Sequence, residues 1–191
     1  MGKKENILNL VIVLTIICAI SALALAYVYN LTKEPIAKQK RLEMIKAIKS
    51  VLPKNVVNDP LKDKIKIDGK IVYIGKDSSG KVVGVAFKCV SNEGYGGKIE
   101  IMLGLKKDGT INAIQILSHS ETPGLGAKIE QPWFKKQFEG RNLKNTKWKV
   151  KKDGGDIDQI SGATISPRAV TKAVYQGLLF FDKNKSKIME D

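Results

Sequence analysis

The sequence runs Val82-Val-Gly-Val-Ala-Phe-Lys-Cys-Val90, then Ile99-Glu-Ile-Met-Leu-Gly-Leu105, then Thr110-Ile-Asn-Ala-Ile-Gln-Ile-Leu117. All three segments are rich in β-branched and other apolar residues, which favour strands. The last segment alternates polar and apolar side chains, so we expect one face of its strand to be buried and the other solvated. With Ile71–Gly75 as a further strand, these segments predict an antiparallel sheet.

Turns and helices surround the predicted strands. Asp77-Ser-Ser-Gly80 and Lys107-Asp-Gly109 are typical of hairpin turns. A short helix is predicted over Gln131–Phe138, and an amphipathic helix from Pro167 to about Phe181. The second helix carries an apolar stripe at helical spacing, formed by Val170, Val174, Leu178 and Phe181. The folded part is therefore expected to be an α+β domain, an antiparallel sheet with flanking helices.

The N-terminal segment has a different composition from the rest of the chain. The 27 residues from Asn6 to Thr32 carry no charge, and Ile, Leu, Val and Ala dominate them. About 20 apolar residues are enough to cross a bilayer as a helix, so residues 1–32 predict a transmembrane anchor. A cleaved signal peptide is the alternative, but the apolar run exceeds the roughly 7–15 residues usual for such a peptide. Lysines flank both ends of the span, so the charge count leaves the orientation open.

Residues 33–53 predict an amphipathic connecting helix that starts near Pro35 and is stopped by Pro53, leaving residues 54–191 as the folded domain. The chain has 33 basic and 19 acidic residues, a net charge of +14. The lysine-rich segments Glu34–Leu52, Lys62–Lys70 and Lys144–Lys152 contain no aromatic residue apart from Trp148, so no nucleic-acid partner is expected. Two cysteines and one histidine predict neither a disulfide framework nor a multi-histidine metal site. We expect His119 to be a structural or surface residue, with proton transfer as the alternative, and we predict no catalytic residue.

The segment Asp158-Gln-Ile-Ser-Gly-Ala-Thr-Ile-Ser166 leads into the amphipathic helix. Ser166 is the expected N-cap and Pro167 the expected first helical residue. Thr164 then lies just ahead of a helix N-terminus, where free N–H groups and the helix dipole favour a phosphate. Gly162 and Ala163 let a ligand approach the backbone. These residues predict an anion-binding loop, with a plain capped helix as the alternative.

Two further loops are rich in glycine. One is Asn92-Glu-Gly-Tyr-Gly-Gly97, between two predicted strands, and the other is Glu121-Thr-Pro-Gly-Leu-Gly126, after the last strand. The first is not a dinucleotide-binding fingerprint, because its glycine spacing differs and a strand is expected after it instead of a helix. Both are expected to be shaped loops, with ordinary turns as the alternative for each taken alone.

In combination, the three motifs resemble a known family. Asp158-Gln-Ile-Ser-Gly-Ala-Thr164 resembles the flavinylation motif DxxSGAT of FMN-binding domains, whose threonine hydroxyl carries FMN through a phosphoester bond. Preceded by the two glycine loops and one N-terminal membrane helix, it resembles the G subunit of the Rnf electron-transport complex over essentially the whole chain. Ser166-Pro167 departs from the Thr-Ser of many relatives. The C subunit of the sodium-translocating NADH:quinone oxidoreductase is a second, typically longer, relative.

The resemblance implies a membrane-anchored electron-transfer subunit of an ion-translocating ferredoxin:NAD oxidoreductase, with no independent turnover. It implies FMN covalently bound to Thr164, a flavin transferase that attaches it, and other Rnf subunits as partners. The expected place is the inner (cytoplasmic) membrane, single-pass, with the flavin domain on the extracytoplasmic side. A basic, membrane-anchored binding module without redox activity is a separate alternative.

The resemblance also implies a set of residues around the flavin. Arg168 is the expected charge partner of the phosphate, while Glu121 and Thr122 are the expected polar neighbours of the ring. The complete set of expected cofactor-binding residues is Thr164, Asp158, Ser161, Gly162, Ala163, Arg168, Glu121, Thr122, Gly124, Leu125, Gly126, Tyr95 and Gly96.

Overall fold

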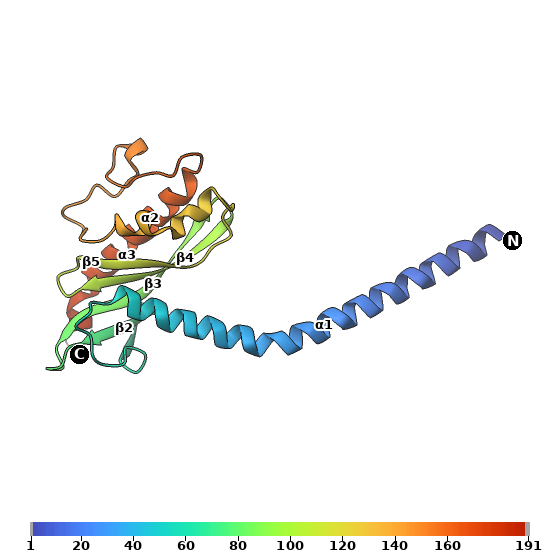
Figure 1. Cartoon of the computed structure of the whole chain (residues 1–191), viewed down its shortest axis with the longest axis horizontal. Helices are drawn as coiled ribbons and strands as arrows, with labels where there is room; N and C mark the ends of the chain where they lie inside the picture. The colour runs from blue at the N-terminus through green and yellow to red at the C-terminus, as the bar shows by residue number, and fades with distance from the viewer. Residues whose placement is uncertain (1, 190–191) are drawn as a thin grey trace. The chain divides into compact units, whose positions relative to one another are not determined.

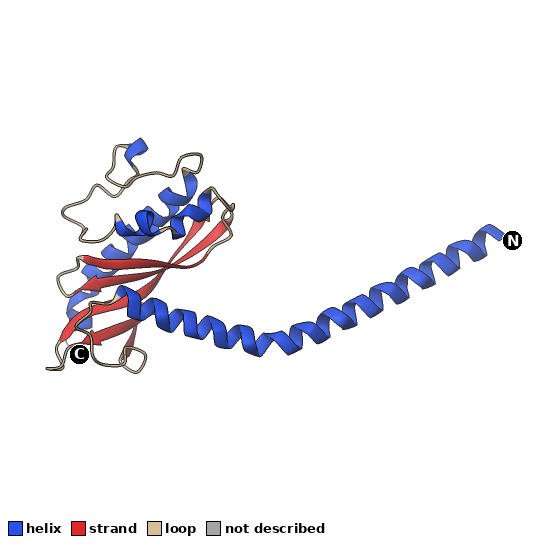
Figure 2. Cartoon of the chain, viewed as in Figure 1, coloured by secondary structure: helices blue, strands red, loops and turns tan. Residues whose placement is uncertain are grey.

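The computed structural model describes residues 2–189, and side chains from residue 7 to residue 189. The chain divides into two compact units, Met1–Leu42 and Glu43–Asp191. Helix α1, Gly2–Val51, begins in the first unit and ends in the second (Figure 1). The other helices and all strands belong to the second unit (Figure 2).

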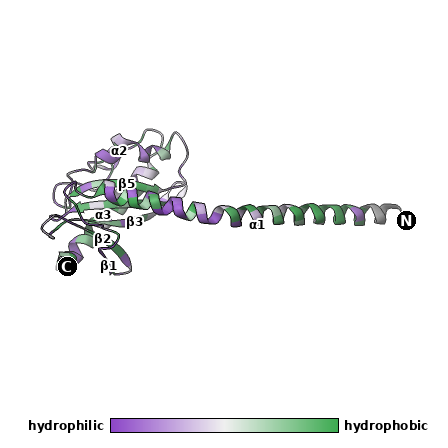
Figure 3. Cartoon of the chain, turned by 60° about the horizontal axis from the view of Figure 1, so that its bottom comes forward, coloured by the Kyte–Doolittle hydropathy of each residue, from purple (hydrophilic) through white to green (hydrophobic). Residues whose placement is uncertain are grey.

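Helix α1 carries the apolar segment predicted as an anchor. Its side chains from Ile7 to Leu31 are exposed, and hydrophobic residues dominate this part of the helix (Figure 3). It is long and apolar enough to cross a membrane, and no other helix among residues 2–189 is. The prediction of a separate helix starting at Pro35 is wrong, because α1 runs through this residue. A proline removes one backbone hydrogen bond, and a helix of 50 residues retains the rest on both sides.

Five antiparallel strands form one sheet in the order β1-β2-β3-β4-β5, with every connection a hairpin. The strands are β1 (Lys64–Ile67), β2 (Lys70–Lys76), β3 (Val82–Gly94), β4 (Gly97–Lys106) and β5 (Ile111–Ser118). The predicted antiparallel sheet is therefore confirmed, with β1 as an additional edge strand. Its Lys-Ile-Lys-Ile sequence is too short and too basic to stand out from the surrounding loop.

Aspartates shape two of the hairpin turns, as predicted. Asp77 Oδ1 accepts the backbone N–H groups of Ser79 at 2.9 Å and Lys81 at 3.0 Å. Asp108 Oδ1 accepts the N–H of Thr110 at 2.9 Å. Such side-chain acceptors replace backbone partners within a tight turn.

Two apolar clusters cover the two faces of the sheet. On one face, α3 (Ile165–Met189) and α2 (Pro132–Lys136) bury the larger core, which includes the predicted stripe of Val170, Val174, Leu178 and Phe181. On the other face, the end of α1 packs Ile48 and Val51 against Tyr73 and Met102. The approach is close at Gly104, where a Cβ atom would lie 2.1 Å from the carbonyl oxygen of Val51.

Short helical turns complete the second unit. The 3₁₀ helices η1 (Gly126–Glu130) and η2 (Lys151–Asp153) lie in the connections, and α2 is shorter than the predicted Gln131–Phe138. Helix α3 is longer at both ends than predicted. Its earlier start changes the geometry of the loop that precedes it.

Candidate functional site

Three loops meet around a cavity of about 570 Å³ at one end of the sheet. They are the turn between β3 and β4, the segment after β5, and the segment leading into α3. The residues that line the cavity are Tyr95, Glu121, Thr122, Leu125, Gly126, Gly162, Ala163, Thr164, Ile165, Ser166 and Arg168. The three motifs singled out in the sequence therefore come together in space.

Thr164 lies at the N-terminus of α3. The helix begins at Ile165, and the carbonyl oxygen of Thr164 accepts the N–H of Arg168 at 3.4 Å, so Thr164 occupies the N-cap position. The first N–H groups of a helix have no acceptor within it, and the helix dipole places partial positive charge there. Thr164 thus places its hydroxyl group in the cavity lining, beside N–H groups that favour an anion.

The prediction that Ser166 caps this helix is wrong. Ser166 lies inside the first turn and is only 1% exposed. Its hydroxyl donates a short hydrogen bond to Glu121 Oε2 instead of accepting one from the helix backbone. Glu121 is far away in the sequence, so the local pattern of a serine before a proline could not reveal this partner.

Glu121 is the buried acid that connects the three loops. It is 5% exposed, and its Oε1 accepts the N–H of Gly96 at 2.9 Å while its Oε2 accepts the hydroxyl proton of Ser166. The contact requires glycine at position 96, because a Cβ atom there would lie 1.8 Å from the carbonyl oxygen of Ser120. Glu121 therefore lines the cavity and also fixes the turn between β3 and β4 against α3.

His119 supports the same segment from outside the cavity lining. Its Nδ1 accepts the N–H of Glu121 at 3.0 Å, and its Nε2 lies 3.0 Å from Glu130 Oε1. The next turn is closed by the carbonyl oxygen of Thr122, which accepts the N–H groups of Leu125 and Ala127, both at 3.2 Å. The contacts of His119 are those of a structural residue.

Arg168 lines the cavity but already has a carboxylate partner. Its Nε and Nη2 donate to the two carboxylate oxygens of Asp153 at 2.6 and 2.5 Å. The hydrogen bond from Arg168 holds the pKa of Asp153 below its ordinary value, and the same pair raises the pKa of Arg168. Arg168 was expected to pair with a phosphate, whereas here its charge is shared with Asp153.

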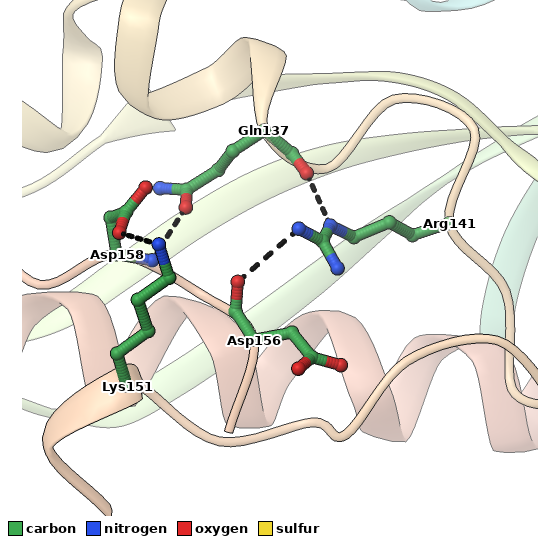
Figure 4. A network of polar contacts seen from close by, with 5 residues as sticks. All are labelled: Gln137, Arg141, Lys151, Asp156 and Asp158. Atoms are coloured by element: carbon green, nitrogen blue, oxygen red, sulfur yellow. Dashed lines mark hydrogen bonds and ion pairs between the residues drawn. The ribbon is translucent and has the colours of Figure 1, made fainter. Parts of the chain in front are cut away.

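Four of the expected cofactor-binding residues are not part of the cavity lining: Asp158, Ser161, Gly124 and Gly96. Asp158 forms an ion pair with Lys151 at 2.6 Å, and its N–H donates to Gln137 Oε1 at 2.7 Å (Figure 4). Gly96 is connected to the lining by the hydrogen bond that its N–H donates to Glu121. Conversely, Ile165 and Ser166 line the cavity although neither was expected to. Their places follow from the earlier start of α3.

The residues present fit FMN. A cavity of about 570 Å³ lies within the roughly 300–1,000 Å³ typical of small-molecule sites. The helix N-terminus offers a phosphate site beside a threonine hydroxyl, and Tyr95, Leu125 and Ile165 supply apolar surface for an aromatic ring. Among the described residues, no group of three or more His, Cys, Asp or Glu side chains could hold a metal ion.

Comparison with known proteins supports this interpretation of the site. Residues 94–179, which contain all three loops, match the family described as FMN-binding domain, and residues 1–51 match the RnfG N-terminal region. The chain is similar to NqrC of Shewanella oneidensis, whose crystal structure gives a TM-score of 0.52 at 20% identity over 72% of this chain and 73% of that one. At this identity the likeness concerns the fold alone.

Similarity to curated relatives extends over most of the chain. The G subunit of the ion-translocating oxidoreductase complex of Cereibacter sphaeroides is 38% identical over 182 residues, 89% of this chain and 82% of the relative. The protein of the same name from Vibrio atlanticus is 33% identical over 193 residues, 93% of this chain and 91% of the relative. The chain therefore belongs to the family of G subunits of ion-translocating oxidoreductase complexes and contains an FMN-binding domain.

Proposed function

We propose that this chain is a membrane-anchored flavoprotein subunit that carries electrons through FMN esterified to Thr164 Oγ1. It acts within an ion-translocating ferredoxin:NAD oxidoreductase of the Rnf type. One observation carries the proposal: the FMN-binding domain has a threonine at the N-cap of α3, in the lining of a cavity large enough for a flavin. The match of residues 1–51 to the RnfG N-terminal region favours this assignment over a C-type subunit of the sodium-translocating NADH:quinone oxidoreductase.

The proposed attachment is a phosphoryl-group transfer. Thr164 Oγ1 forms a bond to the flavin phosphorus and loses its proton, while a second phosphate leaves with the remainder of an activated flavin dinucleotide. A separate flavin transferase supplies this donor and accepts the proton. The N–H groups at the start of α3 and the helix dipole stabilise the phosphate that remains. A covalent bond also prevents loss of the cofactor.

The chain's own residues then hold the cofactor and shape its surroundings. Bound FMN supplies redox chemistry, and the protein supplies orientation and electrostatics. Glu121 fixes the turn at Gly96 and the first turn of α3 to each other at the cavity. Leu125 and Ile165 give the cavity apolar walls that exclude water from a ring lying against them. Arg168, with Asp153, places a cation within the first turn of α3.

The proposed place of the chain is the inner membrane. Helix α1 serves as a single-pass anchor, since its segment from Ile7 to Leu31 exposes apolar side chains on all sides. The flavin domain lies on the extracytoplasmic side, where the transferase modifies it, and other Rnf subunits are its partners. A basic binding module without redox activity does not explain why three separate loops enclose one cavity in an FMN-binding domain.

Flavin fluorescence on a denaturing gel tests the attachment. The full chain produced with a flavin transferase should fluoresce after denaturation, and Thr164→Val should abolish the signal. Thr122→Val is the matched control, because Thr122 is a second threonine in the lining of the same cavity and should leave attachment intact. Fluorescence that persists in Thr164→Val would place the bond elsewhere and overturn the proposal.

A further inference from the structure

A basic segment lies between α2 and the loop that leads into α3. Residues 141–152, here called the basic loop, contain six basic residues and no acidic one. Apart from the short η2, the whole connection from residue 137 to residue 164 has no helix or strand. Connections longer than about 12–15 residues without secondary structure are uncommon in compact domains and are usually functional or disordered. The contacts of the connection from residue 137 to residue 164 show whether it is ordered.

The basic loop is held in a defined conformation. Trp148 Nε1 donates to the carbonyl oxygen of Asn142 at 3.2 Å. The indole ring stacks on the rings of Phe138 and Tyr175, with 6.5 and 6.3 Å between ring centroids. Arg141 donates to the carbonyl oxygens of Gln137 at 2.5 Å and Asp156 at 3.2 Å (Figure 4). A surface fixed in this way loses little conformational entropy when a partner binds.

The acidic residues that follow the basic loop are used to fix it. Asp153 binds Arg168, Asp156 Oδ2 accepts the N–H of Lys147 at 2.7 Å, and Asp158 pairs with Lys151 at 2.6 Å. Four other lysines are exposed and form no ion pair with any residue between 7 and 189: Lys144, Lys147, Lys149 and Lys152. The folded loop therefore presents four uncompensated positive charges to its surroundings.

These charges lie beside the flavin cavity. Arg168 lines the cavity and binds Asp153 through both carboxylate oxygens. Asp153 in turn lines a hollow together with Lys147 and Lys149 of the basic loop, and Lys152 directly precedes it in the chain. Arg168 and Asp153 thus connect the cavity to the basic loop.

We propose that the basic loop is the docking surface for an acidic patch on the protein that exchanges electrons with this subunit. The proposal rests on the proposed function, because it assumes a redox cofactor in the cavity. Complementary charge accelerates encounter and fixes the orientation of partners. A partner held at the basic loop lies next to the cavity, which shortens the path that an electron must cross. One partner is oxidised as the other is reduced, and no bond forms or breaks.

The position of the loop favours a protein over an anionic membrane surface. Lipid headgroups would pair with the same lysines, but they exchange no electrons and gain nothing from lying beside the flavin cavity. The basic loop is also next to strand β5, since the carbonyl oxygen of Arg141 accepts the N–H of Ile111 at 2.8 Å. The exposed lysines of the β1 region lie at the opposite edge of the sheet and serve as an internal control.

Two charge-matched variants of the full chain, each assembled with its complex in membranes, test the proposal. The loop variant combines K144Q, K147Q, K149Q and K152Q. The control variant, which removes the same charge from exposed lysines around β1, combines K54Q, K62Q, K64Q and K66Q. The measured quantity is the rate at which flavin absorbance is bleached after reduced ferredoxin is added, at low and at high salt. Electrostatic steering changes the rate of association between partners by about 10- to 1,000-fold, and bleaching slows when association limits it.

The expected result is a rate about tenfold lower in the loop variant at low salt, with little remaining salt dependence. The control variant should behave like the unaltered chain. Equal rates in both variants would overturn the proposal. If the loop variant instead binds phosphatidylglycerol vesicles more weakly than the control at an unchanged rate, the loop is a lipid-binding surface and the proposal is also wrong.

Zero-length carbodiimide cross-linking, which joins a lysine amine to a carboxylate, gives a second readout. Mass spectrometry of the cross-linked membranes should find loop lysines joined to aspartate or glutamate of another protein, and high salt should suppress these products. Absence of such links would contradict the proposal even if the chain carries flavin. Absence of flavin together with these links would contradict only the proposed function, so the two failures are distinguishable.

Discussion

The side chains of Glu121 and Ser166 share a buried hydrogen bond although 45 residues separate them in the chain. Glu121 uses its other oxygen for the N–H of Gly96. One carboxylate therefore holds the segment after β5, the turn between β3 and β4, and the first turn of α3. Because Thr164 directly precedes that helix, the position of the proposed attachment residue depends on Glu121.

Removing this carboxylate should destabilise the domain. Glu121→Ala leaves the buried hydroxyl of Ser166 without its charged acceptor, which costs about 1–3 kcal/mol, and also removes the hydrogen bond that holds the N–H of the exposed Gly96. We expect the free energy of unfolding to fall by about 3 kcal/mol, measured by urea denaturation of the full chain in detergent. Glu139→Ala is the control, because Glu139 is exposed. A loss no larger than in this control would show that Glu121 does not hold the loops together.

Gly96→Ala should disrupt the same end of the sheet by steric conflict. The added methyl group would lie 1.8 Å from the carbonyl oxygen and 2.4 Å from the carbonyl carbon of Ser120, so backbone must move. We expect a loss of about 3 kcal/mol, the upper end of overpacking penalties, together with reduced flavin attachment. Thermal unfolding and flavin fluorescence measure the two effects. Asn92→Ala, in the same hairpin but exposed, should behave like the unaltered chain. A Gly96→Ala variant of unchanged stability would mean that the turn is not held at this distance.

Glu100 should make stability depend on pH. Lys98 Nζ lies 2.5 Å and Lys88 Nζ 3.3 Å from its Oε1. The hydrogen bond with Lys98, followed by the charge of Lys88, holds the pKa of Glu100 below its ordinary value of 4.5. The folded state then binds fewer protons than the unfolded state just below this pH. The stabilisation is complete above 4.5 and is lost as the pH falls through the lower folded-state pKa.

The Glu100→Gln variant tests whether Glu100 makes the domain less stable as the pH falls. Its free energy of unfolding, measured in urea at a series of pH values from neutral to below 4.5, should fall less steeply with acid than that of the unaltered chain. Asp77 and Asp108 also have lowered pKa values, because they accept hydrogen bonds within their turns, so part of the acid dependence should remain. Identical curves for the variant and the unaltered chain would contradict the assignment to Glu100.

Cys89 should be chemically inert in the folded domain. It is buried in β3, and this burial raises the pKa of its thiol to about 12. Because the thiolate is the nucleophile, iodoacetamide at neutral pH should alkylate Cys89 only after denaturation. Cys18→Ser provides a background in which Cys89 is the single cysteine. Mass spectrometry measures the extent of alkylation. Equal alkylation of the folded and the denatured protein would contradict burial of Cys89.

Local patterns were enough to predict most of the fold. Four strands and their turns follow from residue alternation and from Asp-based turn signals, which act over a few neighbouring residues. Strand β1 was missed because Lys64–Ile67 depends on pairing with β2 and not on its own sequence. The uninterrupted helix at Pro35 was missed because a proline removes one backbone hydrogen bond, whereas α1 continues on both sides of it.

The site was only partly predictable from sequence. The family resemblance implied that the three glycine-bearing loops surround one ligand, and residues of all three line one cavity. The partners of the polar residues could not be identified in the same way. Ser166 bonds to Glu121 and Arg168 to Asp153, at separations of 45 and 15 residues. Only the folded chain brings these pairs together.

The mass of the intact full chain, produced with a flavin transferase, tests covalent attachment at Thr164 most directly. We predict an increase equal to FMN less one water molecule, located on the peptide that contains Thr164 and absent from Thr164→Val. The Thr122→Val control should show the same increase as the unaltered chain. An unmodified mass, under conditions in which the transferase loads another covalent flavoprotein, would contradict this attachment, as would an equal increase in Thr164→Val.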